Sequence, residues 1–285
     1  MKKFISVILS IAMLGGIVVV SASGNASENV SQNPIAFMDC FEPMPIVENL
    51  SSDCWGAELT GPRDQGNGLE DREIENYAYW DGGIIKDEET DKYYMFASRW
   101  DEEKGHGGWK NSVGIYAVSD NFYGPYVEQE GLLWPDNRNG AGHNVFPFKL
   151  KEGDPNGKYA IINSDNGRPG DIFVADSLDG PWKYCTSITS NIEGGGFVAI
   201  NVAVLLRPDG KYQALGRYGD IAIADDLKGP WRVVVDSLWE QVPHLPYRDA
   251  DGANRLEDPT MWYSNGMYHI VVNHWNMRKA FFMSS

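Results

Sequence analysis

Four polar residues recur at nearly equal spacing, each directly before a short apolar stretch: Asp81, Asn144, Asn201 and Asp258. The intervals between them are 63, 57 and 57 residues, and Glu257 directly precedes the last of them. Carboxylates that share a site suit acid and base catalysis, because repulsion between like charges raises the pKa of one of them. Asp and Asn also favour turns at strand ends. The pattern therefore marks either a catalytic site or a set of equivalent turns.

Histidine and arginine residues lie near these positions. His143 directly precedes Asn144, and His274 ends a predicted strand of the last repeat. An imidazole there could transfer protons or bind a metal ion through water, but a lone histidine more often only forms hydrogen bonds. Polar residues at a similar depth in the other repeats are Arg99 with Trp100, Arg168 and Arg217. Arginine binds a carboxylate with two parallel hydrogen bonds, so these side chains favour an acidic sugar as ligand, unless each pairs with one of the chain's 40 acidic residues.

A turn motif repeats in step with these positions. An Asp, a short spacer, Gly-Pro and an aromatic residue occur at residues 120–126, 176–182 and 225–231. Glycine tolerates unusual backbone angles and proline fixes φ, so Gly-Pro predicts a turn. Apolar runs precede the motif in each repeat. Each unit therefore reads strand, turn, strand, loop, strand, Gly-Pro turn, strand.

Four-stranded units at this spacing are typical of the blades of a β-propeller. The sequence therefore predicts an all-β fold of four-stranded antiparallel blades over residues 77–285. In a propeller the innermost strand of each blade runs along the axis, and equivalent residues of a cyclic repeat occupy equivalent places. We therefore expect one depression at one end of the propeller, with Arg99 and Arg217 in its wall and lined by Asp81, His143, Asn144, Asn201, Glu257 and Asp258.

The repeat also predicts how many blades the chain contains. The aligned polar residue and the Gly of the turn motif are separated by 43, 36 and 28 residues in the first three units. A fourth Gly-Pro would fall at about residue 286 or later, and the sequence ends at Ser285. We expect three full blades and most of a fourth, with the remainder missing. The alternative is a small propeller that is complete and closes in an atypical way.

Three stretches resemble the blade starts of five-bladed propeller glycosidases, namely glycoside hydrolase family 43 and the related families 32 and 117. They are residues 79–85 (YWDGGII), 142–145 (GHNV) and 256–263 (LEDPTMWY), the last followed by Tyr268-His269. The resemblance implies a glycoside hydrolase with three acids on successive blades: a base or nucleophile, a supporting Asp and an acid Glu. Asp81 matches the first. The second and third blades offer Asn144 and Asn201 instead, so the triplet does not carry over whole: either the acid is Glu257, or the chemistry differs.

These residues can be assigned to a hydrolytic mechanism. Asp81 would serve as the base and Glu257 as the acid, with Asp258 and His143 in support. Hydrolysis with inversion needs carboxyl groups about 6.5–9.5 Å apart, and retention needs about 5–5.5 Å. Carboxylates on non-adjacent blades favour the wider gap and inversion. Asn144, Asn201, Arg99, Trp100, Arg168, Arg217 and His274 would bind the substrate, a plant, algal or host polysaccharide or oligosaccharide.

Two other functions stay open. The first is a polysaccharide lyase acting on an acidic glycan, in which arginines neutralise the uronate while His143 and Tyr218 move protons. The second is a propeller that binds carbohydrate without cleaving it, because the acids expected on the second and third blades are absent. The ultraviolet absorbance of an unsaturated product separates lyase from hydrolase, and binding without cleavage marks the third possibility.

The N-terminal segment predicts export. Residues 1–22 contain Lys2-Lys3, an apolar run over 4–20 and small residues at the end, which is the pattern of a secretory signal peptide. No later segment reaches the roughly 18 apolar residues that span a membrane. Residues 23–76 do not match the repeat and form an irregular lead-in. The mature protein is expected in the periplasm or outside the cell.

Composition narrows the partners. The net charge is −16, from 24 basic and 40 acidic residues, which argues against nucleic acid as a partner. Of the three cysteines, Cys40 and Cys54 could form a disulfide, with Cys185 buried as an apolar residue. Residues 249–252 lack the further spacing of a calcium loop. We expect no cofactor, apart from the option of a channel ion such as calcium, and the oligomeric state stays open.

Overall fold

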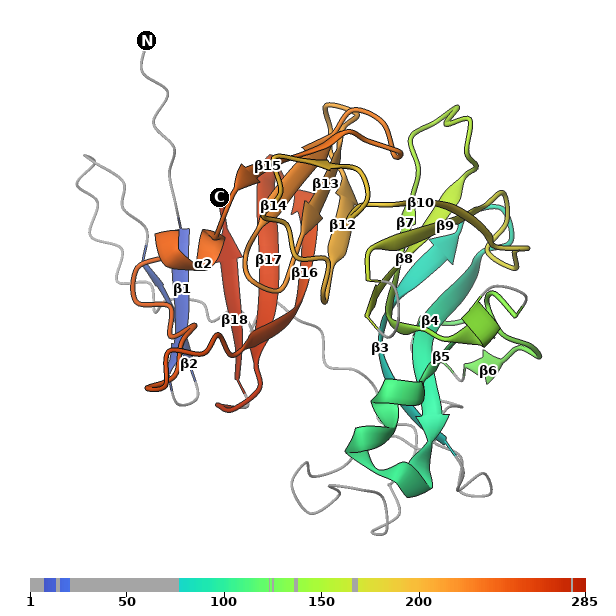
Figure 1. The fold of residues 1–285 in the computed structure, drawn as a ribbon, viewed down its shortest axis with the longest axis horizontal. Helices are drawn as coiled ribbons and strands as arrows, with labels where there is room; N and C mark the ends of the chain where they lie inside the picture. The colour runs from blue at the N-terminus through green and yellow to red at the C-terminus, as the bar shows by residue number, and fades with distance from the viewer. Residues whose placement is uncertain are drawn as a thin grey trace. The chain divides into compact units, whose positions relative to one another are not determined.

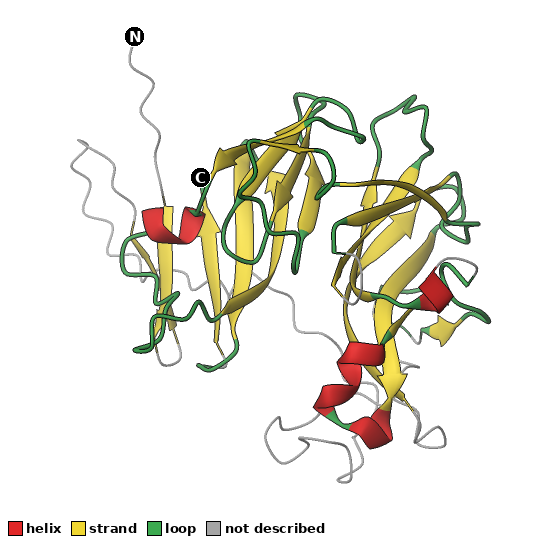
Figure 2. Ribbon diagram, viewed as in Figure 1, coloured by secondary structure: helices red, strands yellow, loops and turns green. Residues whose placement is uncertain are grey.

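The computed structural model describes residues 8–13, 16–20, 77–122, 124, 126–135, 138–165, 169–277 and 279–285. Within these ranges the chain consists mainly of strands and loops, with short 3-10 helices and one four-residue α-helix, α2 (Leu238–Gln241) (Figure 1; Figure 2). It divides into two compact units, Met44–Asn191 and Met1–Pro43 with Ile192–Ser285. The predicted lead-in, the Cys40–Cys54 disulfide and Arg168 lie outside the described residues. In the described part of the chain, no helix has both the length and the apolar character of a membrane span.

The unit Met44–Asn191 contains two four-stranded antiparallel sheets (Figure 1). The strands of the first follow one another in chain order: β3 (Tyr77–Asp87), β4 (Lys92–Asp101), β5 (Val113–Ser119) and β6 (Val127–Glu128). The second has the same order: β7 (His143–Lys149), β8 (Tyr159–Asp165), β9 (Asp171–Ala175) and β10 (Lys183–Ser187). The first strands of the two sheets, β3 and β7, lie next to each other.

The other unit contains two five-stranded sheets. One follows chain order through four antiparallel strands, with a short parallel strand, β11 (Ile192–Glu193), beside the last: β12 (Ala203–Leu206), β13 (Tyr212–Leu215), β14 (Ile221–Ala224) and β15 (Trp231–Val235). The other has the order β16 (Leu256–Ser264), β17 (Met267–His274), β18 (Lys279–Ser284), β1 (Ile8–Met13) and β2 (Gly16–Val20). Here too the first strands, β12 and β16, are neighbours.

The all-β class and the four blade-type sheets are confirmed by this topology. The fourth sheet differs from the others, because its fourth place is taken by β1, which pairs antiparallel with β18 in the register Ile8↔Ser284. β1 and β2 come from the segment predicted as a signal peptide, whose Val- and Ile-rich run also suits a strand. Export, the five-bladed type and the missing remainder of the fourth blade stay predictions.

The Gly-Pro motifs form the predicted turns. Their glycines all have positive φ, which is +94° at Gly124, +85° at Gly180 and +89° at Gly229, a conformation in which a side chain would be strained. The aromatic residue after each motif is buried in all three sheets: Tyr126, Trp182 and Trp231. Two of them also donate a hydrogen bond to the carbonyl four residues earlier, at 2.8 Å for Tyr126 Oη and 3.1 Å for Trp231 Nε1. The repeat seen in the sequence is therefore a repeat in space within each unit.

Apolar side chains fill the interior of each unit. In Met44–Asn191, Trp134 stacks on Phe173 with ring centroids 4.2 Å apart and planes inclined by 15°, and Phe96 meets the edge of Trp182. Such aromatic pairs add about 0.5–1.5 kcal/mol beyond the burial of their area. The other unit buries Tyr212, Trp231, Leu256, Val272 and Phe281. Cys185 is half-buried rather than enclosed in a core, and it is a thiol.

Candidate active site

The four aligned polar residues share one unusual backbone conformation. The φ angle is +46° at Asp81, +49° at Asn144, +48° at Asn201 and +50° at Asp258. This left-handed region is open mainly to glycine, asparagine and aspartate. The alignment made from spacing is therefore confirmed, and the backbone explains why each position holds Asp or Asn. The backbone conformation does not explain why two of these positions hold Asp and the other two hold Asn. A chemical role for the two carboxylates would explain that difference.

Asp81 lies beside His143 in the unit Met44–Asn191. The β3–β4 register shifts between Trp80 and Gly82, which singles out Asp81 on its strand. Its Oδ2 lies 3.6 Å from Nε2 of His143, which begins β7. Both side chains are largely buried, with 16% and 9% of their surface exposed. The two predicted catalytic residues of this unit therefore come together.

Ser112 determines which nitrogen of His143 carries a proton. Its Oγ lies 2.7 Å from the carbonyl oxygen of Gly142, 2.8 Å from that of Trp109 and 3.1 Å from His143 Nδ1. The hydroxyl has one hydrogen, and a carbonyl needs it because a carbonyl cannot donate. Nδ1 therefore donates to Oγ, and Nε2 carries a hydrogen only when the ring is charged. A hydrogen bond between His143 and Asp81 requires that extra proton.

Backbone groups of this region are held by side chains of neighbouring strands. The N–H of Asn144 donates to Ser98 Oγ, and the N–H of His143 donates to Asn163 Oδ1, both at 3.0 Å. Asn144 itself is 7% exposed. The side chain predicted to bind substrate at this position is therefore almost enclosed, and its strand start is rigidly placed.

An exposed indole lies next to Asp81. Trp80 keeps 37% of its surface exposed, with its ring centroid 6.0 Å from that of Trp100 and 5.7 Å from that of His106. Trp100, the residue predicted to contact substrate, is 5% exposed and donates from Nε1 to the carbonyl of Gly105 at 3.0 Å. Trp100 therefore supports Trp80 from inside, and Trp80 is the aromatic residue that solvent reaches.

In the other unit Asn201 contacts Asp258. The Asn201 Nδ2 donates a hydrogen bond to Asp258 Oδ1, so two aligned residues of neighbouring sheets meet directly. Next to Asp258, the Glu257 carboxylate is 25% exposed, and its Oε2 lies 3.8 Å from Arg217 Nη2. The Arg217 Nε also donates to the carbonyl of Leu256 at 3.2 Å. Asn201, Asp258, Glu257 and Arg217 therefore form one connected group.

The surroundings of Glu257 favour its protonated form. Burial raises the pKa of Glu257, and the adjacent Asp258 carboxylate raises it further, while Arg217 acts in the opposite direction. A carboxyl group that holds its proton towards neutral pH suits a general acid. Sequence spacing alone placed Glu257 beside Asp258, and the structure adds the burial.

The described arginines among the predicted ligands are paired with carboxylates. Arg99 Nη1 donates to Glu128 Oε1, and its guanidinium lies 4.2 Å from the ring centroid of Tyr77. Glu128 also accepts a hydrogen bond of 2.5 Å from Tyr79, whose pKa is raised by burial and by that carboxylate. Arg217 faces Glu257, as described above. Both arginines therefore pair with acidic residues of the chain, which is the alternative that the sequence left open, rather than presenting their guanidinium groups to a uronate.

His274 forms contacts inside its own unit. It is 1% exposed, its Nδ1 accepts from the N–H of Met277 at 3.2 Å, and its Nε2 lies 4.0 Å from Asp249 Oδ1. His143 Nδ1 lies 3.1 Å from Ser112 Oγ, and its Nε2 lies 3.6 Å from Asp81 Oδ2. Among the described residues, no three His, Cys, Asp or Glu side chains are grouped to hold a metal ion. A channel ion therefore stays a prediction, and the described residues offer no matching set of donors for it.

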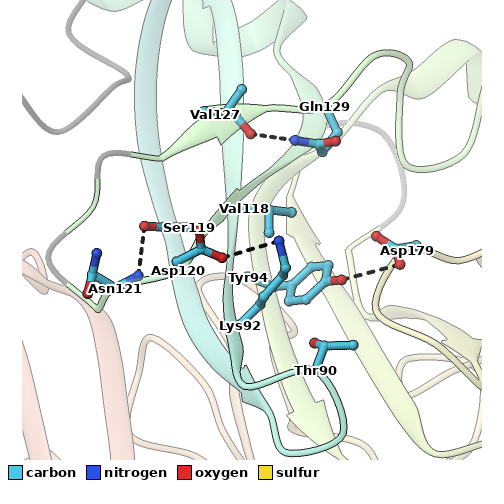
Figure 3. Close-up of a pocket in the computed structure, with 10 residues that line it drawn as sticks. All are labelled: Thr90, Lys92, Tyr94, Val118, Ser119, Asp120, Asn121, Val127, Gln129 and Asp179. Atoms are coloured by element: carbon cyan, nitrogen blue, oxygen red, sulfur yellow. Dashed lines mark hydrogen bonds and ion pairs between the residues drawn. The ribbon is translucent and has the colours of Figure 1, made fainter.

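A polar groove of about 590 Å³ lies at the other end of β3 (Figure 3). Its walls include Lys92, paired with Asp120 at 3.2 Å, and Tyr94, which donates to Asp179 at 3.2 Å. The β3–β4 turn that borders it is six residues along the strand from Asp81, or about 20 Å at a rise of about 3.3 Å per residue. This groove is therefore separate from Asp81.

Comparison with known proteins gives structural likeness only. No protein-family model and no curated protein sequence matches the chain. A family 43 β-1,3-galactosidase is 15% identical, with a TM-score of 0.47 over 73% of this chain and 43% of that one. A family 43 β-xylosidase/α-arabinofuranosidase from a compost microbial metagenome is 15% identical, with a TM-score of 0.46 over 74% of each chain. An endo-arabinase from Bacteroides thetaiotaomicron is 16% identical, with a TM-score of 0.47 over 70% of this chain and 72% of that one.

The described residues thus bring together two predicted groups, one in each unit. Asp81 meets His143, and Asn201 meets Asp258 beside Glu257 and Arg217. The expectation that all six residues line one depression extends across both units and stays a prediction. Sequence reasoning missed Ser112 and Trp80 as members of the first group.

Proposed function

We propose that this protein is an exported glycoside hydrolase of the five-bladed propeller type that cleaves a polysaccharide or oligosaccharide by carboxylate acid and base catalysis. One observation supports it above the others. Four equivalent positions share the same left-handed backbone, yet only Asp81 and Asp258 carry a carboxylate, and each is met by a side chain from the neighbouring sheet. A purely structural repeat would have no reason to distinguish them.

Glu257 is proposed as the general acid. Burial and the neighbouring Asp258 raise its pKa, so it can hold a proton for the leaving glycosidic oxygen. As the bond between that oxygen and the anomeric carbon breaks, the proton passes from the carboxyl group to the departing sugar. Arg217, 3.8 Å away, then stabilises the carboxylate that remains.

Asp81 is proposed as the base that takes a proton from the attacking water. His143 lies 3.6 Å from it, and Ser112 holds the imidazole with Nδ1–H directed away from Asp81. The imidazole ring therefore positions the Asp81 carboxylate and shares a proton with it, while Asp81 remains the base. Trp80, the residue before Asp81, is exposed and offers an aromatic surface for a sugar ring.

The arrangement of these groups gives weaker support to the two other functions. A lyase needs a cation open to a uronate, and both Arg99 and Arg217 already face carboxylates. A non-catalytic binding propeller gives no role to a partly buried Glu257 with a raised pKa. We therefore favour hydrolysis over elimination or binding alone.

The proposal is tested by assaying the purified protein on a panel of neutral and acidic glycans. Asp81→Asn and Glu257→Gln are each expected to lower kcat at least about 100-fold, in line with the contribution of a positioned acid or base. Glu240→Gln serves as the matched control, because Glu240 is an exposed acid of the same unit as Glu257 and pairs with Arg248 at 3.0 Å. Full activity in both active-site variants would contradict the proposal. An unsaturated product that absorbs in the ultraviolet would indicate the lyase instead.

A further inference from the structure

The open end of the β16–β17 hairpin carries an exposed tryptophan close to Glu257. Trp275 directly follows β17 and keeps 42% of its surface exposed. Its N–H donates to the carbonyl of Arg255 at 3.3 Å, which extends the pairing of the two strands beyond Leu256 and His274. Trp275 therefore occupies a fixed place on the hairpin that carries Glu257.

Trp275 lies on the same face of the hairpin as Glu257. Directly paired residues of antiparallel strands point to one side, and successive pairs alternate. The pair Leu256 and His274 is buried, while Glu257 and its partner Asn273 lie on the opposite, partly exposed face. The next pair on that exposed face is Arg255 with Trp275. The backbone of Trp275 is thus about 7 Å from that of Glu257 along the strand direction, two residues at about 3.3 Å each.

Charged neighbours hold this indole in one orientation. The Arg255 guanidinium lies over the Trp275 ring, 5.0 Å from its centroid. It is held in turn by Asp249 Oδ2 at 2.8 Å from Nε and Asp251 Oδ2 at 2.5 Å from Nη2. Asn276 also donates to Asp249. Although Arg255 lies against the ring, 42% of the surface of Trp275 is exposed and can meet a ligand, and a side chain held in place loses little entropy on binding.

The charges around the platform favour a neutral ligand. Two aspartates balance Arg255, and Glu257 faces Arg217. Asp258 adds a further negative charge beside Glu257, where it would repel a carboxylate on the sugar. We propose that Trp275 stacks against a neutral sugar unit of the glycan, bound next to the unit whose linkage Glu257 protonates. The position of this sugar unit next to the cleaved linkage rests on the proposed function, whereas its stacking on Trp275 does not.

Binding to an inactive variant tests the stacking directly. The probes are xylotriose, arabinotriose, galactotriose and the acidic trigalacturonate, each titrated calorimetrically into Glu257→Gln protein. We expect at least one neutral trisaccharide to bind and trigalacturonate to bind at least tenfold more weakly. Adding Trp275→Ala should weaken neutral binding about tenfold, and Trp275→Phe, which keeps an aromatic ring, only about two- to fourfold.

Tyr263→Ala is the matched control. Tyr263 is 37% exposed and lies at the closed end of the same hairpin, where it pairs with Tyr268. Its loss should leave the dissociation constant unchanged. Unchanged affinity in Trp275→Ala, tighter binding of trigalacturonate, or no binding of any neutral probe would each overturn the inference.

The same experiment separates this inference from the proposed function. If Trp275→Ala loses affinity while the unmodified protein cleaves no glycan, the stacking site stands and hydrolysis fails. If the protein hydrolyses a glycan and Trp275→Ala changes neither affinity nor KM, hydrolysis stands and the stacking site fails. Near-ultraviolet circular dichroism of Trp275→Phe checks that the fold is retained.

Discussion

The two units present the same backbone feature with different chemistry. In Met44–Asn191 the carboxylate of Asp81 is met by the imidazole of His143, and in the other unit the carboxylate of Asp258 is met by the amide of Asn201. An amide donates a hydrogen bond at every pH, whereas an imidazole gains and loses a proton near neutrality. One carboxylate therefore sits beside a neutral amide donor, and the other beside an imidazole, whose ring nitrogens can donate or accept.

This difference assigns separate tasks to the two aspartates. Asp258 accepts from a permanent donor, and its carboxylate is one cause of the raised pKa of Glu257. Asp81 instead lies 3.6 Å from an imidazole nitrogen, a type of group that can donate or accept a proton. The same backbone conformation therefore recurs at Asp81 and Asp258, and the side chain from the neighbouring sheet sets which type of group each carboxylate meets.

The largest expected effect separates these tasks. Asp81→Asn should lower kcat at least about 100-fold, because the base is lost, whereas Asp258→Asn should lower it about tenfold. Asp258→Asn also removes one cause of the raised pKa of Glu257. Activity that needs protonated Glu257 falls as pH rises through that pKa, so the upper limb of the pH–rate profile should move to lower pH. Equal losses in both variants, with no movement of the limb, would remove the distinction.

A second expected effect concerns a buried aspartate of the repeat. Asp220 directly precedes β14, as Asp171 begins β9 in the other unit, and both are buried. Burial is the main cause that raises the pKa of Asp220 to about 6. The folded state therefore binds the proton more tightly than the unfolded chain. Its contribution to stability is complete below about pH 4 and is lost as pH rises through about 6.

Asp220→Asn should therefore stabilise the protein at high pH. The asparagine stays neutral, so the free energy of unfolding should rise by about 2–3 kcal/mol at pH 8 and change little at pH 4. Denaturant unfolding at the two pH values measures this. Asp225→Asn is the control of opposite sign, because the Lys211 ammonium lowers the pKa of Asp225. A variant of Asp220 that is less stable than the parent at pH 8 would show that its charge is compensated.

A third, smaller effect tests whether the common backbone is the reason for the Asp/Asn pattern. Asn201→Ala and Asn201→Gly both remove the amide, but only alanine is strained at φ +48°. The alanine variant should be about 1–2 kcal/mol less stable than the glycine variant. Because φ is +49° at Asn144, the same difference is expected there. Thermal unfolding of the four variants measures it, and alanine variants as stable as the glycine variants would contradict it.

The sequence predicted the features that depend on repetition. The intervals of 63, 57 and 57 residues located all four left-handed positions, and the Gly-Pro motifs located the turns before β6, β10 and β15. Both follow from local rules, because few residues tolerate positive φ. The pairing of consecutive strands followed as well, since short connections favour neighbouring strands, but the places of β1, β2 and β11 in their sheets did not.

The contacts made by the loop between β4 and β5 could not be predicted from the sequence. The segment His106–Asn111 forms a 3-10 helix, in which a Cβ at Gly108 would lie 2.2 Å from the Trp100 ring. That segment covers Trp100 and leaves Trp80 exposed, whereas the sequence indicated Trp100 as a substrate contact. It also delivers Ser112 to His143 from 31 residues away. No periodic pattern carries such information, because it depends on how one loop folds back.

The smallest expected effect concerns Ser112 and the proton shared by Asp81 and His143. Ser112→Ala removes the acceptor of Nδ1–H, so a neutral His143 can move its hydrogen to Nε2 and donate to Asp81 without a second proton. The kcat should change only about two- to fivefold, because the Asp81 carboxylate itself is kept. Nitrogen-15 chemical shifts of the His143 ring should report the change of tautomer directly. Ser112→Thr, which keeps the hydroxyl, should restore the shifts of the parent protein. If Ser112→Ala leaves the ring tautomer as Nδ1–H, then Ser112 does not position that proton, and the contrast with the amide of Asn201 loses its structural basis.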